Sequence, residues 1–154
     1  MSSRLALLDD ILTALEQAGD RLRATHEGLD RLFPLTPERF QSLDESHREK
    51  LDAYAIRYAR CQDLLYPVMR ALGRAQMEPK AERSFLELFA LMQKQGVVDS
   101  IDDWERQRGL RNAISHEYPN PVEIVDILNA IREAVPEILN YCQAVRRKAD
   151  ELNG

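Results

Sequence analysis

Glycine and proline are scarce in this chain, which has six glycines and seven prolines among its 154 residues. That leaves little material for the many turns of an all-β sandwich, and no stretch shows the strict apolar and polar alternation of a strand. No sequence period repeats along the chain either. The signal that is present is apolar residues at spacings of three and four, which is typical of amphipathic helices. The sequence therefore predicts an all-α protein.

Cysteine and long apolar runs are also rare. Cys61 and Cys142 are too few and too far apart for a disulfide framework or for a zinc site with paired close ligands. No apolar run approaches the roughly 18 residues of a membrane span, and acids at Asp9 and Asp10 interrupt the stretch that a signal peptide needs. We expect a cytoplasmic protein with reduced thiols, no membrane contact, no cofactor and no metal site.

Positive charge is not in excess, since 21 Lys and Arg stand against 26 Asp and Glu, giving a formal net charge of −5. Broad electrostatic binding to nucleic acid relies on Lys and Arg, so the acidic balance argues against it. Any nucleic-acid chemistry must use a local basic site. The length fits one domain, residues 1–154.

The apolar spacing predicts an up-and-down bundle of about five helices in this single domain. A loop with one short helix is expected over 25–43, and Pro67 is expected to kink or break the second long helix. Ser100 is a predicted N-cap, and Gly96 a predicted helix stop. The first four predicted helices cover about 4–24, 44–72, 79–95 and 100–117, and the fifth begins at about 120 and ends near the basic run 146–148.

Three motifs that mark common enzyme classes are missing: a phosphate-cradling glycine loop, a His-Glu-x-x-His zinc helix and a Gly-x-Ser-x-Gly elbow. What remains is a concentration of arginine, amide, hydroxyl, imidazole and phenol groups between residues 106 and 119. Helical geometry stacks Arg108, Asn112 and His116 on one face and puts Arg111 and Tyr118 on a neighbouring stripe. One edge of the bundle would then carry cations beside a titratable imidazole.

This set of groups suits phosphodiester cleavage. A histidine with a pKa near neutrality transfers protons, and arginine stabilises the charge that develops on the phosphoryl oxygens. RNA supplies its own 2′-OH as nucleophile, so the reaction requires no metal. Because one chain offers one imidazole at the motif, a symmetric homodimer with facing motif helices would supply the second.

The segment 111–118, Arg-Asn-Ala-Ile-Ser-His-Glu-Tyr, resembles the Arg-x4-6-His signature of the HEPN superfamily, and specifically the Arg-x4-His-x-Tyr pattern of its HepT branch. The resemblance implies a helical, dimeric, metal-independent ribonuclease toxin whose antitoxin partner is an MNT-type nucleotidyltransferase. It also implies that Arg111 and His116 are catalytic, that Asn112 supports them, and that the partner attaches AMP to Tyr118. Arg108 and Ser115 are added as further supporting residues.

Other interpretations stay open for each of these residues. His116 could be a helix-end imidazole that interacts with exposed carbonyls, Arg111 could form a structural salt bridge to Glu117 or to another helix, and Tyr118 could be a packing residue. Gln62 and Asp63, polar residues within the second long helix, could face the motif, but we expect solvated positions for them. His26 and His47 are expected to be solvent residues.

For the whole chain, the alternative to a ribonuclease is a protein without catalytic activity. It would be a substrate-binding or scaffold subunit of a minimal nucleotidyltransferase, with the same partner enzyme and the same helical bundle. These two hypotheses differ in whether the chain itself cleaves RNA, and a third possibility is a helical dimer unrelated to either.

Overall fold

The structure of the chain is a computed structural model, and it describes residues 3–116 and 120–153. This range contains six α-helices and two 3₁₀ turns, and it contains no strand. In chain order they are α1 (Ser3–Gly28), η1 (Asp30–Leu32), α2 (Pro37–Ser42), α3 (Glu45–Ala75), η2 (Pro79–Glu82), α4 (Phe85–Lys94), α5 (Ile101–Ile114) and α6 (Pro121–Asn153).

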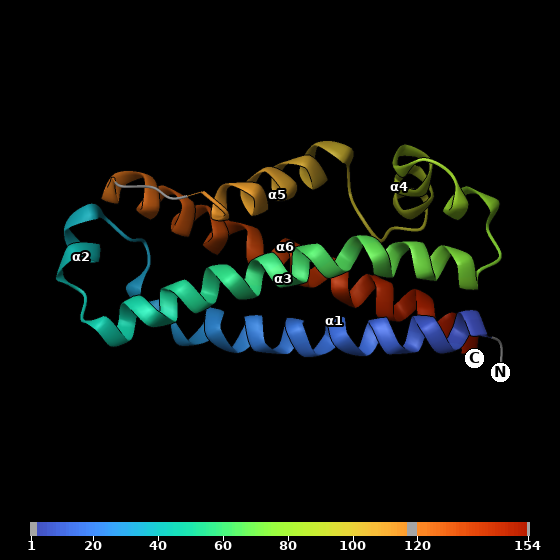
Figure 1. The fold of residues 1–154 in the computed structure, drawn as a ribbon, viewed down its shortest axis with the longest axis horizontal. Helices are drawn as coiled ribbons and strands as arrows, with labels where there is room; N and C mark the ends of the chain where they lie inside the picture. The colour runs from blue at the N-terminus through green and yellow to red at the C-terminus, as the bar shows by residue number, and fades with distance from the viewer. Residues whose placement is uncertain (1–2, 117–119, 154) are drawn as a thin grey trace.

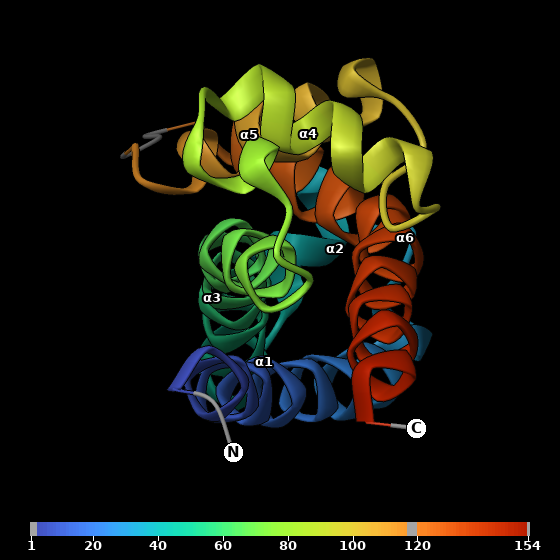
Figure 2. The same ribbon diagram turned by 90° about the vertical axis from the view of Figure 1, so that its right-hand side faces the viewer.

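Four of the helices run lengthwise along the molecule in alternating directions: α1, α3, α5 and α6 (Figure 1). Helix α4 departs from this pattern and lies across the others, so that it is seen nearly end-on in Figure 1 and from the side in Figure 2. The prediction of an all-α bundle is confirmed. The structure has one α-helix more than the five of the predicted bundle. This additional helix is α2, the short helix expected within 25–43.

The predicted helix ends are mostly correct where a cap defines them. The side chain of Asp44 accepts a hydrogen bond from the His47 amide at the start of α3, and Ser100 accepts one from the Asp103 amide at the start of α5. Gly96 follows α4 with a φ of +77°, a conformation that glycine adopts without steric cost.

Several features differ from the prediction, and helix α1 also continues to Gly28, past its predicted end near residue 24. The predicted helix over 79–95 is divided into η2 and α4, because Ser84 caps a new helix in the middle. Helix α5 ends at Ile114 rather than near Glu117, with Ser115 as its C-cap. Of the two outcomes expected at Pro67, a kink or a break, the structure excludes the break: the missing amide costs one hydrogen bond to the Asp63 carbonyl, while burial of apolar residues on both sides of the proline keeps the helix continuous.

A single apolar cluster fills the space between the helices. Cys61 and Cys142 are free and buried in it, and burial raises the pKa of the Cys61 thiol to about 12. None of the described helices combines the length and the apolar character that a membrane crossing needs. The core consists mainly of residues on one face of α1, α3 and α6, among them Leu8, Leu12, Leu15, Leu22, Tyr54, Tyr58, Leu65, Met69, Leu72, Ile131, Val135 and Ile138.

Candidate functional site

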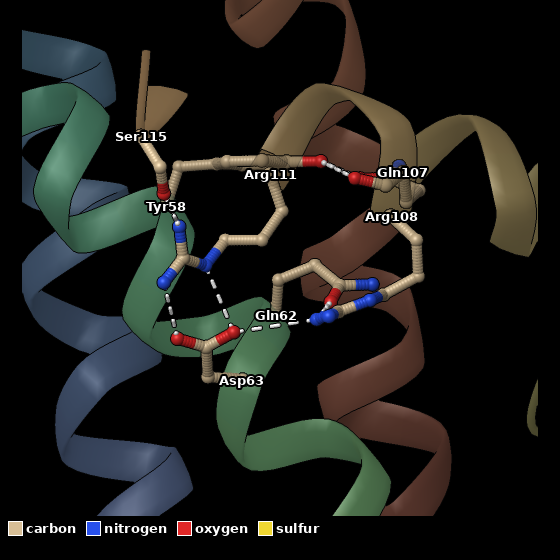
Figure 3. A network of polar contacts seen from close by, with 7 residues as sticks. All are labelled: Tyr58, Gln62, Asp63, Gln107, Arg108, Arg111 and Ser115. Atoms are coloured by element: carbon tan, nitrogen blue, oxygen red, sulfur yellow. Dashed lines mark hydrogen bonds and ion pairs between the residues drawn. The ribbon is translucent and has the colours of Figure 1, made fainter. Parts of the chain in front are cut away.

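Helix α5 lies on the bundle with a small buried face. Only Trp104 and Gln107 are buried among its 14 residues. The side of α5 that faces α3 carries residues spaced four, three and four positions apart. They are Trp104, Arg108, Arg111 and Ser115. Figure 3 shows the two arginines on this side of α5 reaching over α3 toward Asp63. The motif residues are therefore on the surface, against the middle of a long helix.

The Arg111 guanidinium is held by three hydrogen bonds. Its Nε donates to Oδ1 of Asp63 and its Nη2 to Oδ2, both at 2.9 Å, which is the parallel two-bond geometry that arginine forms with carboxylates. Its Nη1 donates to the Ser115 hydroxyl at 2.9 Å. An arginine side chain has five N–H donors, so two of the five stay available on Arg111.

Arg108 joins the same carboxylate from one turn earlier in α5. Its Nη1 donates to Oδ1 of Asp63 at 3.3 Å and to Oε1 of Gln62 at 2.7 Å (Figure 3). Two guanidinium groups thus share one carboxylate, and the local charge is 2 − 1 = +1. This cluster, Arg108, Arg111 and Asp63, is called the arginine pair site below. It is a local positive site on a chain whose net charge is −5.

The ion pair also fixes the charge states within the arginine pair site. Hydrogen bonds from Arg111 are the main reason that the pKa of Asp63 lies below its ordinary value, and the charges of Arg111 and Arg108 add to the effect. The same hydrogen bonds raise the pKa of Arg111. Both groups therefore stay ionised through the whole physiological pH range.

Two buried polar side chains, Gln62 and Gln107, lie between the arginine pair site and the apolar core. Gln62 is 0% exposed, and its amide nitrogen has no hydrogen-bond partner among the described residues. Gln107 accepts a hydrogen bond from the Tyr58 hydroxyl and donates to the Ala134 carbonyl at 3.2 Å and to Glu137 at 3.0 Å. These contacts tie α5 to α3 and to α6, so the arginines project from a fixed helix.

Arg111 and His116 line two neighbouring hollows within one chain. Arg111 lines a hollow of about 380 Å³ between α3 and α5, together with Arg60 and the exposed Ile56. His116 lines a hollow of about 270 Å³ nearer to the start of α6, together with Asp52. Ile114 borders both hollows. Both groups reach the surface, but a single chain does not place them in one shared hollow.

The arrangement differs from the stack expected for Arg108, Asn112 and His116. Arg108 points to the same carboxylate as Arg111, because α5 turns both toward α3. Asn112 is exposed, and its side chain makes no hydrogen bond to the described residues. His116 follows the helix end and is exposed, with its amide donating to the Ala113 carbonyl at 3.1 Å. Tyr118 lies outside the described residues.

The expectation of a solvated position was wrong for Gln62, which is fully buried, whereas Asp63 is exposed as expected and in addition faces the motif arginines. Gln62 lies four residues after Tyr58 and three before Leu65, both fully buried, so the helical spacing already placed it on the buried face. Asp63 follows Gln62 in α3, and its carboxylate is directed toward α5. Its partners come from residues 45 and 48 positions away, a separation at which the sequence pattern carries no pairing signal.

No protein-family model, no curated protein and no solved structure matches this chain. The functional argument therefore depends on the arginine pair site, on His116 and on the motif residues themselves.

Proposed function

We propose that this protein is a metal-independent endoribonuclease toxin of the HEPN type, similar to the HepT branch, with RNA as substrate. The observation that carries the proposal is the arginine pair site beside the exposed imidazole of His116. It holds two guanidinium groups against one carboxylate, with a net charge of +1 and unused N–H donors at the surface. A phosphate diester is the anion that such a site would bind.

The positive charge is local, and this fits the acidic composition. A chain with a net charge of −5 does not bind RNA by bulk electrostatics. Arg60 lines the same hollow as Arg111 and is exposed, which adds a third guanidinium. An RNA phosphate would meet Arg60, Arg108 and Arg111 within one patch, with Asp63 keeping two of them oriented.

The reaction would use the 2′-OH of the ribose as nucleophile. One His116 imidazole takes the 2′ proton while the 2′ oxygen attacks the adjacent phosphorus, and the bond from phosphorus to the 5′ oxygen breaks. A second imidazole gives a proton to the leaving 5′ oxygen. Arg111 stabilises the additional negative charge on the phosphoryl oxygens. The products are a 2′,3′-cyclic phosphate and a 5′-OH, which balances atoms and charge without a metal.

A symmetric homodimer would bring the two imidazoles together. One chain places His116 and Arg111 in neighbouring hollows, so a complete site needs the motif of a second copy. Ile56, on the edge of the Arg111 hollow, is 65% exposed and would lie in the contact of the proposed dimer. Sedimentation of the purified protein tests this part.

Regulation by an MNT-type nucleotidyltransferase is the remaining element of the proposal. AMP attached to Tyr118 would place a phosphate group a few residues from the arginine pair site. It would compete there with the RNA phosphate for the same donors. The toxin would act in the cytoplasm, where both the RNA and the partner are found.

Expression of the chain without its partner tests the proposal. We expect growth arrest from the parent chain and normal growth from His116→Ala and from Arg111→Ala. The matched control is His47→Ala, an exposed change at the start of α3 that should leave toxicity intact. Normal growth with the parent chain, at an expression level confirmed by immunoblot, would count against the toxin proposal.

The ion pair between Arg111 and Asp63 favours one other function. A guanidinium engaged by a carboxylate and a hydroxyl is also suited to holding α5 in place. The alternative is then a non-catalytic substrate-binding or scaffold subunit of a minimal nucleotidyltransferase. It predicts a stable complex with that enzyme and neither RNA cleavage nor toxicity.

A further inference from the structure

Three acidic side chains meet on the side of α5 that faces α6, away from Asp63. Asp99 lies in the connection between α4 and α5, Asp103 in the first turn of α5, and Glu137 in α6. One carboxylate oxygen from each lies within 4.8 Å of the others. Asp103 precedes Arg111 by eight residues, about 12 Å along the helix. The acidic cluster is therefore separate from the arginine pair site.

The charge of this cluster is only partly balanced by its neighbours. Arg106 donates to Oδ1 of Asp103 at 2.8 Å from a side chain that is 71% exposed. Asp103 also accepts from the Ser100 hydroxyl at 2.9 Å, and Glu137 accepts from the Gln107 amide at 3.0 Å. Among the described residues Arg106 is the one cation paired with the three acids, so the local charge is −3 + 1 = −2.

Tyr141 provides an independent indication of a missing ligand. Its side chain is 2% exposed, and its hydroxyl has no hydrogen-bond partner among the described residues. It follows Glu137 by one helical turn, and helical side chains lean toward the preceding turn. A buried hydroxyl without a hydrogen-bond partner destabilises the folded chain, so a ligand bound by this hydroxyl would be stabilising.

The ring of Tyr141 lies 6.5 Å from that of Trp104, the residue after Asp103, so Tyr141 is close to the acidic cluster. Burial is the largest cause that raises the pKa of Tyr141 far above its ordinary value. The negative charges of Glu137, Asp99 and Asp103 raise it further. Hydrogen bonding toward Glu137 is a further cause of the raised pKa, although no contact of standard geometry joins the hydroxyl to any of the three carboxylates.

We propose that Asp99, Asp103 and Glu137 bind a divalent cation of the size of Ca²⁺, with the Tyr141 hydroxyl as a fourth oxygen at the site. Carboxylate and hydroxyl oxygens without nitrogen or sulfur ligands favour hard cations. Calcium–oxygen distances of about 2.3–2.6 Å allow two ligand oxygens to lie up to about 5 Å apart, and calcium tolerates irregular geometry. Mg²⁺ needs shorter distances and a regular octahedron, which three acids from separate elements supply less readily.

The bound ion would fix the first turn of α5 to α6. It would bridge the connection before α5, the helix itself and Glu137, which Gln107 already contacts. The C-terminal half of the same helix carries the arginine pair site. Binding to the folded chain alone would raise its stability by mass action. The proposal does not depend on RNA cleavage, because the ion lies about two helical turns from Arg111.

The single tryptophan gives a direct measurement. Trp104 directly follows Asp103, and its ring lies 6.5 Å from that of Tyr141. The full chain, freed of ions by a chelating resin, is titrated with CaCl₂ and separately with MgCl₂ while Trp104 fluorescence is followed. We expect saturation at one Ca²⁺ per chain, at least tenfold weaker binding of Mg²⁺, and a higher melting temperature with Ca²⁺ present.

Variants distinguish this site from diffuse binding to an acidic surface. Asp99→Asn alters an exposed side chain and leaves the Asp99 carbonyl free to accept from Gln93, and Glu137→Gln keeps an oxygen acceptor for Gln107. Each should weaken Ca²⁺ binding at least tenfold. Asp126→Asn, an exposed change on α6, should not alter it. No saturable signal up to about 10 mM Ca²⁺, above the range of weak protein sites, would overturn the proposal, and so would parent-like binding by Asp99→Asn and Glu137→Gln.

Discussion

The Asp63 carboxylate receives two parallel hydrogen bonds from Arg111, each 2.9 Å long, across the contact between α3 and α5. Arg108 adds a third bond to the same carboxylate. This relationship connects the predicted catalytic arginine to the middle of the longest helix in the first half of the chain. It gives Arg111 a defined direction before any substrate arrives, which is what a preorganised phosphate site requires.

The ion pair should have a measurable but modest coupling energy. The side chains of Arg111 and Asp63 are 24% and 46% exposed, so solvent screens their attraction. In a double-mutant cycle with Arg111→Ala and Asp63→Ala, we expect a coupling of about 0.5–1 kcal/mol in urea unfolding. The cycle of Arg23→Ala and Asp20→Ala, a more exposed pair 3.5 Å apart in α1, serves as the comparison and should give less. Equal couplings for the two pairs would contradict a special role for the two-bond geometry.

Asp63→Asn should separate binding from catalysis. Removing the carboxylate charge raises the local charge from +1 to +2, so RNA should bind more tightly and KM should fall. The amide cannot accept two parallel bonds, so Arg111 loses its fixed direction and kcat should fall by about tenfold or more. Steady-state cleavage of a short RNA measures both constants. A change confined to stability, with kcat and KM as in the parent, would show that Asp63 does not position Arg111 for the reaction.

Two glycines in helices should respond in opposite directions to replacement by alanine. Nothing lies within 4 Å of a Cβ placed on Gly109, whereas a Cβ on Gly73 would come within 2.7 Å of the Ala81 Cβ. Gly109→Ala should therefore stabilise the chain by up to about 1 kcal/mol, through helix propensity. Gly73→Ala should destabilise it by about 1–3 kcal/mol through overpacking. Urea unfolding of both variants checks the prediction, and the same sign for both would contradict the packing of α3 against η2.

Stability should depend on pH through His26, which the structure places against Tyr54 rather than in solvent. Its Nδ1 lies 2.5 Å from the Tyr54 hydroxyl, and its carbonyl accepts from Arg132 at 2.7 Å. Burial, followed by the charge of Arg132, lowers the pKa of His26 below its ordinary value of 6.5. The unfolded chain then takes up the proton first as the pH falls below about 6.5.

This contribution to stability is complete above about pH 6.5 and is lost as the pH decreases toward the folded pKa. The slope has an upper limit of about 1.4 kcal/mol per pH unit for one proton. Urea unfolding between pH 7.5 and pH 5.5 should show the decline in the parent and in the control His47→Gln, and a smaller decline in His26→Gln. An unchanged slope in His26→Gln would assign the pH dependence to other groups.

The sequence predicted the helices well where apolar spacing and caps act together. The apolar spacing predicted the long stripes of α1, α3 and α6, and Ser100 and Gly96, the predicted cap and stop, lie at element ends that the structure confirms. Local rules work there because the cap and the helix it starts are neighbours in the chain. Pro67 shows the limit of such rules, since packing on both sides kept α3 continuous.

The site was less predictable because its partners are distant in sequence. The motif segment identified Arg111, Ser115 and Arg108, but the carboxylate that joins the two arginines lies in another helix. The acidic cluster was equally hard to predict from the sequence, since Asp103 and Glu137 come together only when α5 packs on α6. Helical periodicity gives the face of each residue, and the crossing of two helices decides which faces meet.

The most direct test of the central claim is RNA cleavage by the purified chain in the presence of EDTA. The account predicts cleavage by the parent with 2′,3′-cyclic phosphate ends. It predicts a loss of about 100-fold or more in His116→Ala and in Arg111→Ala, while His47→Ala keeps the parent rate. Intact RNA after incubation with the folded parent protein, or cleavage by His116→Ala at the parent rate, would contradict it.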